Sequence, residues 1–262
     1  LQPHALLGAA GLAALDLLLT YLPHLDYDLQ RHGPDHPKAL AAADALGDHL
    51  AALLDAAQRT GYEVLVFGDY AIRACEGPAI LPNLALRQAG LMHVRIIRDM
   101  AYPDFWYGRA FAMVDHEIAH VHTSGEAALQ SAREVLEALP GVARVLDWQA
   151  QQKAGIDHPR SGDLVIVADP GRWFAYPWWT DRKEAPDFAT HVDIHNKPGF
   201  DPCELFFGWP PGSVSLNTAK VRGTHGTTEP DGDVAWFCTS DFVSEPRTVS
   251  ALGAFIQQWF ST

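Results

Sequence analysis

Tyr21-Leu22-Pro23-His24-Leu25-Asp26-Tyr27-Asp28-Leu29-Gln30-Arg31-His32-Gly33-Pro34 is the stretch from which the fold can be predicted. It follows an apolar run, 13–19, which we interpret as a buried strand. Carboxylates and imidazoles at the carboxyl end of a buried strand lie where α/β folds place their ligands. The stretch therefore predicts the edge of a binding site, and the alternative is a surface loop rich in Asp and His.

The next part of the chain repeats the order of helix, strand and acid. Leucines recur every three or four residues within 39–58, which predicts a helix with one apolar face. A buried strand is expected over 62–67, and Asp69 follows in the loop at its end. This order indicates an α/β fold. Further elements are expected over the ranges 81–89, 92–97, 109–115, 118–123, 126–139, 142–146, 163–168, 173–176 and 249–260.

The composition limits the class of protein and of partner. The chain has 262 residues, 48% of them hydrophobic and 19% charged, which is typical of a globular domain with a substantial core. Its formal net charge of −13 argues against a nucleic-acid polymer or an anionic membrane as the main partner. No apolar run is long enough to span a membrane. A small anionic substrate is still compatible, because a local cation can reverse the sign of the charge inside a cleft.

The cysteines and the first residue give two weaker indications. The chain contains 3 cysteines, too few and too scattered for a disulfide framework, so we expect a reducing compartment and a cytoplasmic location. It begins with Leu rather than Met, which suggests that a segment precedes it.

Three later segments place polar side chains in patterns that suit a site or a cap. His191-Val192-Asp193-Ile194-His195 alternates, so its polar side chains would share one face of an extended segment. Asp201-Pro202-Cys203-Glu204 is typical of a helix cap with Asp in the lead. Gly223-Thr224-His225-Gly226 predicts a tight loop that presents one imidazole.

Taken together, these motifs resemble the alkaline phosphatase superfamily, and within it the type I phosphodiesterase/nucleotide pyrophosphatase branch. Tyr21, Asp26, Gly33 and Pro34 fit its first motif without a gap. The helix that follows carries Asp44 and Gly47, the strand after it ends in Gly68-Asp69-Tyr70-Ala71, and the last motif is matched by 223–226. The resemblance implies a central, mostly parallel sheet flanked by helices, with an additional smaller α+β lobe. Residues 1–262 would form the C-terminal part of one such domain, with 92–176 as an inserted lobe.

The resemblance also implies two divalent metal ions, zinc or manganese, which activate a Thr or Ser nucleophile and stabilise phosphoryl oxygens. Carried over to this chain, the ligands would be Asp26, Gln30, Asp69 and His225. A shifted register of the first motif would use Asp28 and His32 instead. Other metal or substrate candidates are Tyr70, His195 and His116, with His120 beside the last, and Arg31 is a candidate for substrate binding.

The chain departs from the family pattern in three places. Gln30 stands where the first motif has His, and Tyr70 stands where the second has His. The Asp and the nucleophile that lie upstream in the family have no counterpart here. We therefore expect the C-terminal portion of a longer protein, without a catalytic nucleophile of its own, and oxygen-rich sites that suit manganese or magnesium better than zinc.

Three functions are compatible with these features. The leading hypothesis is a metal-dependent hydrolase of phosphodiester or pyrophosphate bonds that acts on a small phosphate-containing substrate. The first alternative is a catalytically inactive scaffold that binds a phosphate-containing ligand or a protein partner. The lower alternative is a phosphomutase or a phosphonate hydrolase. Neither the substrate nor an oligomeric state follows from the sequence.

Overall fold

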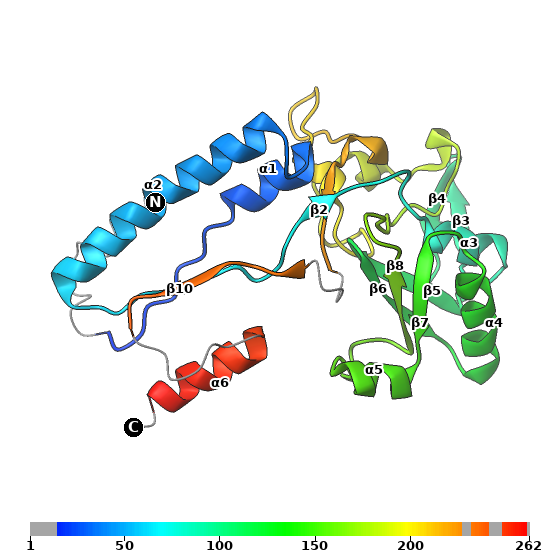
Figure 1. Ribbon diagram of the computed structural model, residues 1–262. Helices are drawn as coiled ribbons and strands as arrows, with labels where there is room; N and C mark the ends of the chain where they lie inside the picture. The colour runs from blue at the N-terminus through cyan, green and yellow to red at the C-terminus, as the bar shows by residue number, and fades with distance from the viewer. Residues whose placement is uncertain (1–14, 227–231, 241–247, 261–262) are drawn as a thin grey trace. The chain divides into compact units, whose positions relative to one another are not determined.

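The structure is a computed structural model, and it describes residues 15–226, 232–240 and 248–260 (Figure 1). The described residues form two compact units. The first unit contains residues 15–25, 41–71, 232–240 and 248–260, and the second contains 26–40 and 72–226.

The first unit combines a long helix with a short strand pair. Helix α2 (Pro37–Thr60), most of which lies here, confirms the helix expected over 39–58. Strand β1 (Leu65–Phe67) pairs antiparallel with β10 (Trp236–Cys238). Helix α6 (Val249–Trp259) begins where the Thr248 hydroxyl accepts a hydrogen bond from the backbone N–H of Ala251, an ordinary N-cap.

The described part of the apolar run that precedes the first motif, residues 15–19, is not a strand, and residues 13 and 14 lie outside the described residues. The described residues 15–19 have no strand pairing, and the side chain of Leu19 is 81% exposed. A buried strand needs a hydrogen-bonded neighbour and a layer that covers its apolar side chains. In this unit β1 pairs with β10 instead, so the prediction of a buried strand over this run was wrong.

The second unit is built on a four-stranded sheet in the order β5-β6-β8-β7. These strands span Ala110–Asp115, Ile118–Thr123, Leu164–Ala168 and Val142–Leu146. Helices α3 (Pro82–Gln88) and α4 (Glu126–Glu137) lie side by side along the sheet (Figure 1). The core between these layers includes the fully buried side chains of Val114, Val121, Leu136, Ile166 and Trp178.

All strand pairs among the described residues are antiparallel, so the structure shows a mixed α/β fold without the mostly parallel sheet expected from the sequence. The β5–β6 connection explains part of the difference, because a turn of two residues, His116-Glu117, can only join antiparallel strands. The segment 173–176, expected as a strand of a hairpin, forms only an isolated bridge from Phe174 to Ile80.

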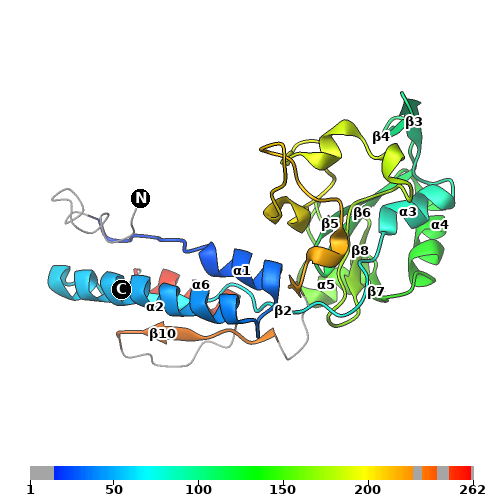
Figure 2. The same ribbon diagram turned by 90° about the horizontal axis from the view of Figure 1, so that it is seen from above.

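Short elements complete the second unit. Strands β3 (Val94–Ile97) and β4 (Met100–Pro103) form a hairpin that projects at its edge (Figure 2). Helix α5 (Trp148–Ala154) is capped by Asp147. Short 3₁₀ helices η3 to η6 span Arg182–Glu184, Asp187–Thr190, Pro202–Leu205 and Thr218–Lys220. The lobe expected over 92–176 stays a prediction.

Helix α1 (His24–His32) replaces the strand-end loop expected for the opening motif. Asp26 lies in its first turn and Arg31 and His32 lie in its last, which suits the helix dipole. Gly33 ends the helix with φ of +84°. None of the described helices combines the length and the apolar character that crossing a membrane requires.

Within the second unit, α1 packs closely on the strand pair of β2 (Arg73–Ala74) and β9 (Gly223–Thr224). The backbone N–H of Arg222 donates to the carbonyl of Gln30 at 2.8 Å. A Cβ added at Gly223 would lie 2.3 Å from the carbonyl oxygen of Leu29, so only glycine permits this approach. The packing brings the first and the last family motif together.

Candidate functional site

Three side chains at one end of the β5–β6 hairpin could hold a metal ion. Asp115 ends β5, His116 begins the turn, and His225 follows β9. One ligand atom from each residue lies within 4.8 Å of the others. Two imidazoles and one carboxylate form a ligand set found around divalent first-row metals.

The turn that carries His116 is fixed by backbone contacts. His116 has φ of +52°, a strained conformation for a residue other than glycine. Its carbonyl accepts a hydrogen bond from the N–H of Phe174 at 2.7 Å. The next residue, Glu117, donates its N–H to the carbonyl of His225 at 2.9 Å. These bonds position the two imidazoles, whose ring centroids lie 4.1 Å apart.

The cluster is partly buried and electrostatically crowded. Burial, and then the charge of His225, holds the pKa of His116 well below its usual range, so this imidazole is neutral at neutral pH. Burial also raises the pKa of Asp115 above its usual range, and the carboxylate of Asp26 adds to this shift, whereas His225 and His120 oppose it. Asp26 therefore lies close enough to the cluster for its charge to act there.

Gln30 holds the carboxylate of Asp26 by hydrogen bonds. Its Nε2 donates to Oδ1 at 2.9 Å and to Oδ2 at 2.8 Å, and the Gln30 side chain is almost completely buried. An imidazole at this position would offer a lone pair to a cation, whereas the amide nitrogen offers only hydrogens. The Gln30 amide oxygen, which is buried and has no hydrogen-bond partner among the described residues, could still face an ion, so the predicted ligand role of Asp26, Gln30 and His225 stays a prediction.

The other predicted residues of the second unit are not members of this cluster. On α1, Asp28 lies 3.8 Å from both His32 and Arg31, and Arg31 Nε donates to the carbonyl of Leu205. Asp69 and Tyr70 belong to the first unit, where Asp69 is exposed. The roles proposed for these side chains stay predictions.

His195 is exposed and lies in a turn, because Asp193 accepts hydrogen bonds from the backbone N–H groups of His195 and Asn196. The prediction of an extended segment over 191–195 was therefore wrong. Asp115 is the member of the cluster that was not among the candidates. Its position between a strand and a turn histidine is the signal that could have identified it.

A buried lysine holds the segment that packs against His116. Lys197 donates from Nζ to the carbonyl of His191, to Asp201 Oδ2 and to Glu204 Oε1, at 2.7, 2.9 and 2.8 Å. Burial raises the pKa of Asp201, and Lys197 opposes this shift. Asp201 caps η5 as predicted, since it accepts the N–H of Cys203. The ring of Phe200, in the same segment, lies 5.2 Å from that of His116.

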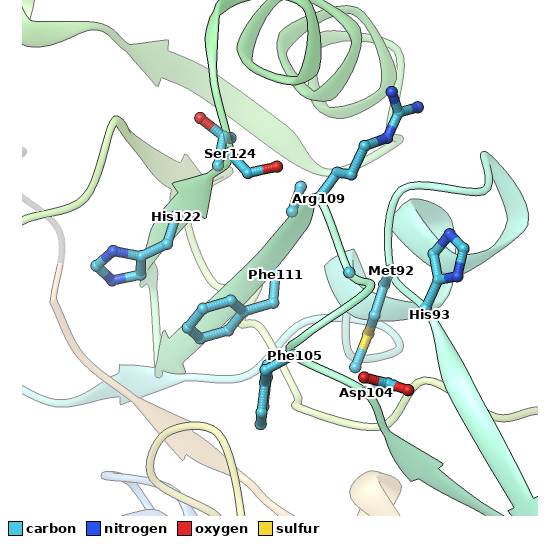
Figure 3. Close-up of a pocket in the computed structure, with 11 residues that line it drawn as sticks. Met92, His93, Asp104, Phe105, Arg109, Phe111, His122 and Ser124 are labelled. Carbon is cyan, nitrogen blue, oxygen red and sulfur yellow. The ribbon is translucent and has the colours of Figure 1, made fainter.

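A separate pocket lies at the other end of the β5–β6 hairpin (Figure 3). Its wall is aromatic: Phe105 meets Phe111 edge-on, and Phe111 stacks on His122. Arg109 points away from these rings, and the carboxylate of Asp104 accepts a hydrogen bond from Arg95. His93, Asp104 and His122 line this pocket, but among the described residues they do not form a close ligand group like the one at the hairpin turn.

Comparison with known proteins establishes the class. The chain belongs to a family of phosphoric ester hydrolases, because a family model matches residues 5–201, most of its length. That family is the type I phosphodiesterase/nucleotide pyrophosphatase family, which confirms the resemblance drawn from the motifs. A comparison with curated proteins finds no match.

Solved structures of similar proteins include both nucleotide and phosphonate enzymes. Murine ectonucleotide pyrophosphatase/phosphodiesterase 5 is 18% identical, with a TM-score of 0.42 over 60% of this chain and 38% of its own. The human form is 13% identical, with a TM-score of 0.43 over 76% and 43%. Phosphonoacetate hydrolase from Sinorhizobium meliloti 1021, in complex with phosphonoacetate, is 15% identical, with a TM-score of 0.44 over 88% and 49%. The chain thus spans less than half the length of these proteins.

Proposed function

We propose that this chain is part of a metal-dependent hydrolase that cleaves phosphodiester or pyrophosphate bonds in a small substrate. The observation that carries the proposal is the packing of α1 on β9, which brings the Asp26 motif and the Gly-Thr-His-Gly loop into one region of the second unit. The family assignment supports it, since the matched residues 5–201 include the Asp26 motif.

The residues suit the binding of a doubly charged ion beside a phosphoryl group. A divalent cation, when bound, polarises a phosphoryl oxygen and stabilises the charge that develops on it. His225 and the carboxylates near it would hold the ion. The predicted roles of Asp69 as a further ligand, of Arg31 in substrate contact and of a nucleophile outside these residues belong to the proposal. So does a cytoplasmic location, which the free thiols of Cys75, Cys203 and Cys238 support.

A second candidate is an inactive scaffold that binds a phosphate-containing ligand. The specific observation in its favour is Gln30, whose amide donates to both oxygens of Asp26 where the family motif has an imidazole. A scaffold of this kind would bind substrate-like phosphates without turning them over.

A substrate panel tests the proposal. The full-length protein would be treated with chelator, resupplied with zinc, manganese or no metal, and given an aryl phosphodiester, a dinucleotide pyrophosphate, an aryl phosphomonoester and phosphonoacetate. The proposal predicts metal-dependent turnover of the diester or the pyrophosphate, and a loss of at least about 100-fold in Asp69→Asn, typical of removing a metal ligand. Turnover of phosphonoacetate alone would favour the phosphonate hydrolase, and turnover of none of them would favour the scaffold.

A further inference from the structure

The imidazole that the first family motif lacks has a counterpart on another element. Gln30 directs its two amide hydrogens to Asp26, so it offers no nitrogen lone pair to an ion. His116, on the β5–β6 turn, brings an imidazole to His225 from a different side, with 4.1 Å between the ring centroids. The chain therefore retains two imidazoles near the last motif.

His116 also has an unexplained polar atom. Its side chain is 1% exposed, and among the described residues its Nε2 has no hydrogen-bond partner. Its Nδ1 has only a 3.5 Å contact with the Thr224 hydroxyl. A buried nitrogen without a hydrogen-bond partner is unfavourable, so such a group calls for an explanation. A bound cation would supply the missing partner.

The turn holds its side chains in place before any ligand binds. Phe174 is hydrogen-bonded to the backbone of His116, and His225 to that of Glu117. Ala168 also donates its N–H to the carbonyl of Glu117 at 2.8 Å. A Cβ added at Gly226 would contact Glu117 at 3.5 Å, so the loop that carries His225 lies directly against the turn. Asp115 keeps an exposed side, which leaves room for water or a phosphate oxygen.

We infer that Asp115, His116 and His225 form a binding site for a first-row divalent cation, in which the β5–β6 turn replaces the ligands that α1 supplies in the family motif. Three protein ligands leave positions open for water and a phosphate oxygen. Asp26, held by Gln30, contributes negative charge beside the site without ligating the ion. The inference rests on the proposed function only for the role of the ion in hydrolysis, because binding of the ion is measured without a substrate.

Cobalt binding by the full-length protein tests the inference. The metal-free protein would be titrated with Co²⁺ and followed by visible absorption, which reports the ligand field without any substrate. Asp115→Asn and His225→Ala should each weaken one site by about 10–100-fold or more, so that one fewer ion binds per chain. His116→Ala should do the same and should remove an imidazole contribution from the spectrum.

Control variants show whether a loss of Co²⁺ binding is specific to the proposed site. His158→Ala removes an exposed histidine of the same unit and should leave the titration unchanged. Asp26→Asn should change the affinity less than Asp115→Asn does. If His116→Ala fails to fold, the exposed and isosteric Asp115→Asn decides the question. Wild-type binding in Asp115→Asn, or loss of the ion in Asp26→Asn alone, would overturn the inference and leave metal-dependent hydrolysis intact. Binding as expected without any turnover would instead overturn the proposed function.

Discussion

Cys75 is a thiol that its surroundings should make unreactive. Burial, together with the charge of Glu117, raises the pKa of Cys75 to about 12, and Arg222 opposes this shift. At pH 8 the thiolate fraction of Cys75 should then be about 10³-fold below that of an ordinary cysteine. Because only the thiolate is nucleophilic, the rate of alkylation should fall by a similar factor. Iodoacetamide labelling followed by peptide mass spectrometry measures the rate. Labelling in denaturant is the control, and a native rate near the denatured one would contradict the expectation.

Asp104 should make stability depend on pH. Arg95 Nε donates to its Oδ2 at 2.7 Å, and this bond, with the N–H groups of Trp106 and Tyr107, holds the pKa of Asp104 below its usual range. The Asp104 carboxyl has a higher pKa in the unfolded chain than in the folded one. Its contribution to the free energy of unfolding is therefore complete above about pH 4, and it disappears as the pH falls through the lower pKa of the folded state. Asp104→Asn should lower the Tm at pH 7, and the two melting curves should converge in acid. A constant difference at all pH values would contradict this assignment.

The motifs selected Asp26 and His225 as site candidates from the resemblance alone. The structure places both in the second unit, and their roles as ligands stay predictions. Asp115 was missed because a single Asp before a turn is common and its place in the cluster depends on His225, more than 100 residues later in the chain. The hydrogen bonds of Gln30 to Asp26 could not be predicted either, since they depend on the helical i to i+4 geometry of a stretch that we expected to be a loop.

At the scale of elements, Gly199 allows a loop to lie along the edge of β5. The segment exchanges hydrogen bonds with Val114, and a Cβ added at Gly199 would lie 2.0 Å from the Val114 carbonyl oxygen, at a φ of +113°. Gly199→Ala should therefore lower the free energy of unfolding by roughly 3 kcal/mol. Chemical denaturation measures this change.

Gly212→Ala is the matched control for that variant. Gly212 also has a positive φ, of +87°, but no atom lies within 4 Å of the added Cβ. Its cost should be about 1 kcal/mol, from backbone strain alone. Equal decreases in the free energy of unfolding of the two variants would show that the close approach to β5 is not what requires glycine at position 199.

Helices and strands with a sustained periodic pattern of apolar residues were predicted well, whereas the pairing of the strands was not. Helices α2 and α4 and strands β5 and β6 lie within a few residues of their expected bounds, because periodicity reports which face of an element is buried. Periodicity does not report the neighbour of a strand, so the antiparallel order β5-β6-β8-β7 was not foreseen. Helix α1 was missed because Asp, His and Gly-Pro are also typical of loops.

The stability of the second unit should depend on the buried cation of Lys197. Lys197 is 1% exposed and bonds to the carboxylates of Asp201 and Glu204. Lys197→Met would leave two carboxylates without their cation, so the free energy of unfolding should fall by about 3–5 kcal/mol. The exposed Lys153 is the control, and Lys153→Met should cost less than about 0.5 kcal/mol. A loss below about 1 kcal/mol in Lys197→Met would show that this network adds little to stability.

The most direct test of the central claim is the turnover of an aryl phosphodiester by the full-length protein, measured after chelation and again after addition of zinc or manganese. The same assay would be run on His225→Ala, with His158→Ala as its control. We expect that chelation abolishes turnover, that a divalent ion restores it in the wild type and in His158→Ala, and that His225→Ala stays at least about 100-fold slower. Turnover that survives chelation, or that His225→Ala leaves unchanged, would contradict a hydrolase that works through a cation held at the last motif.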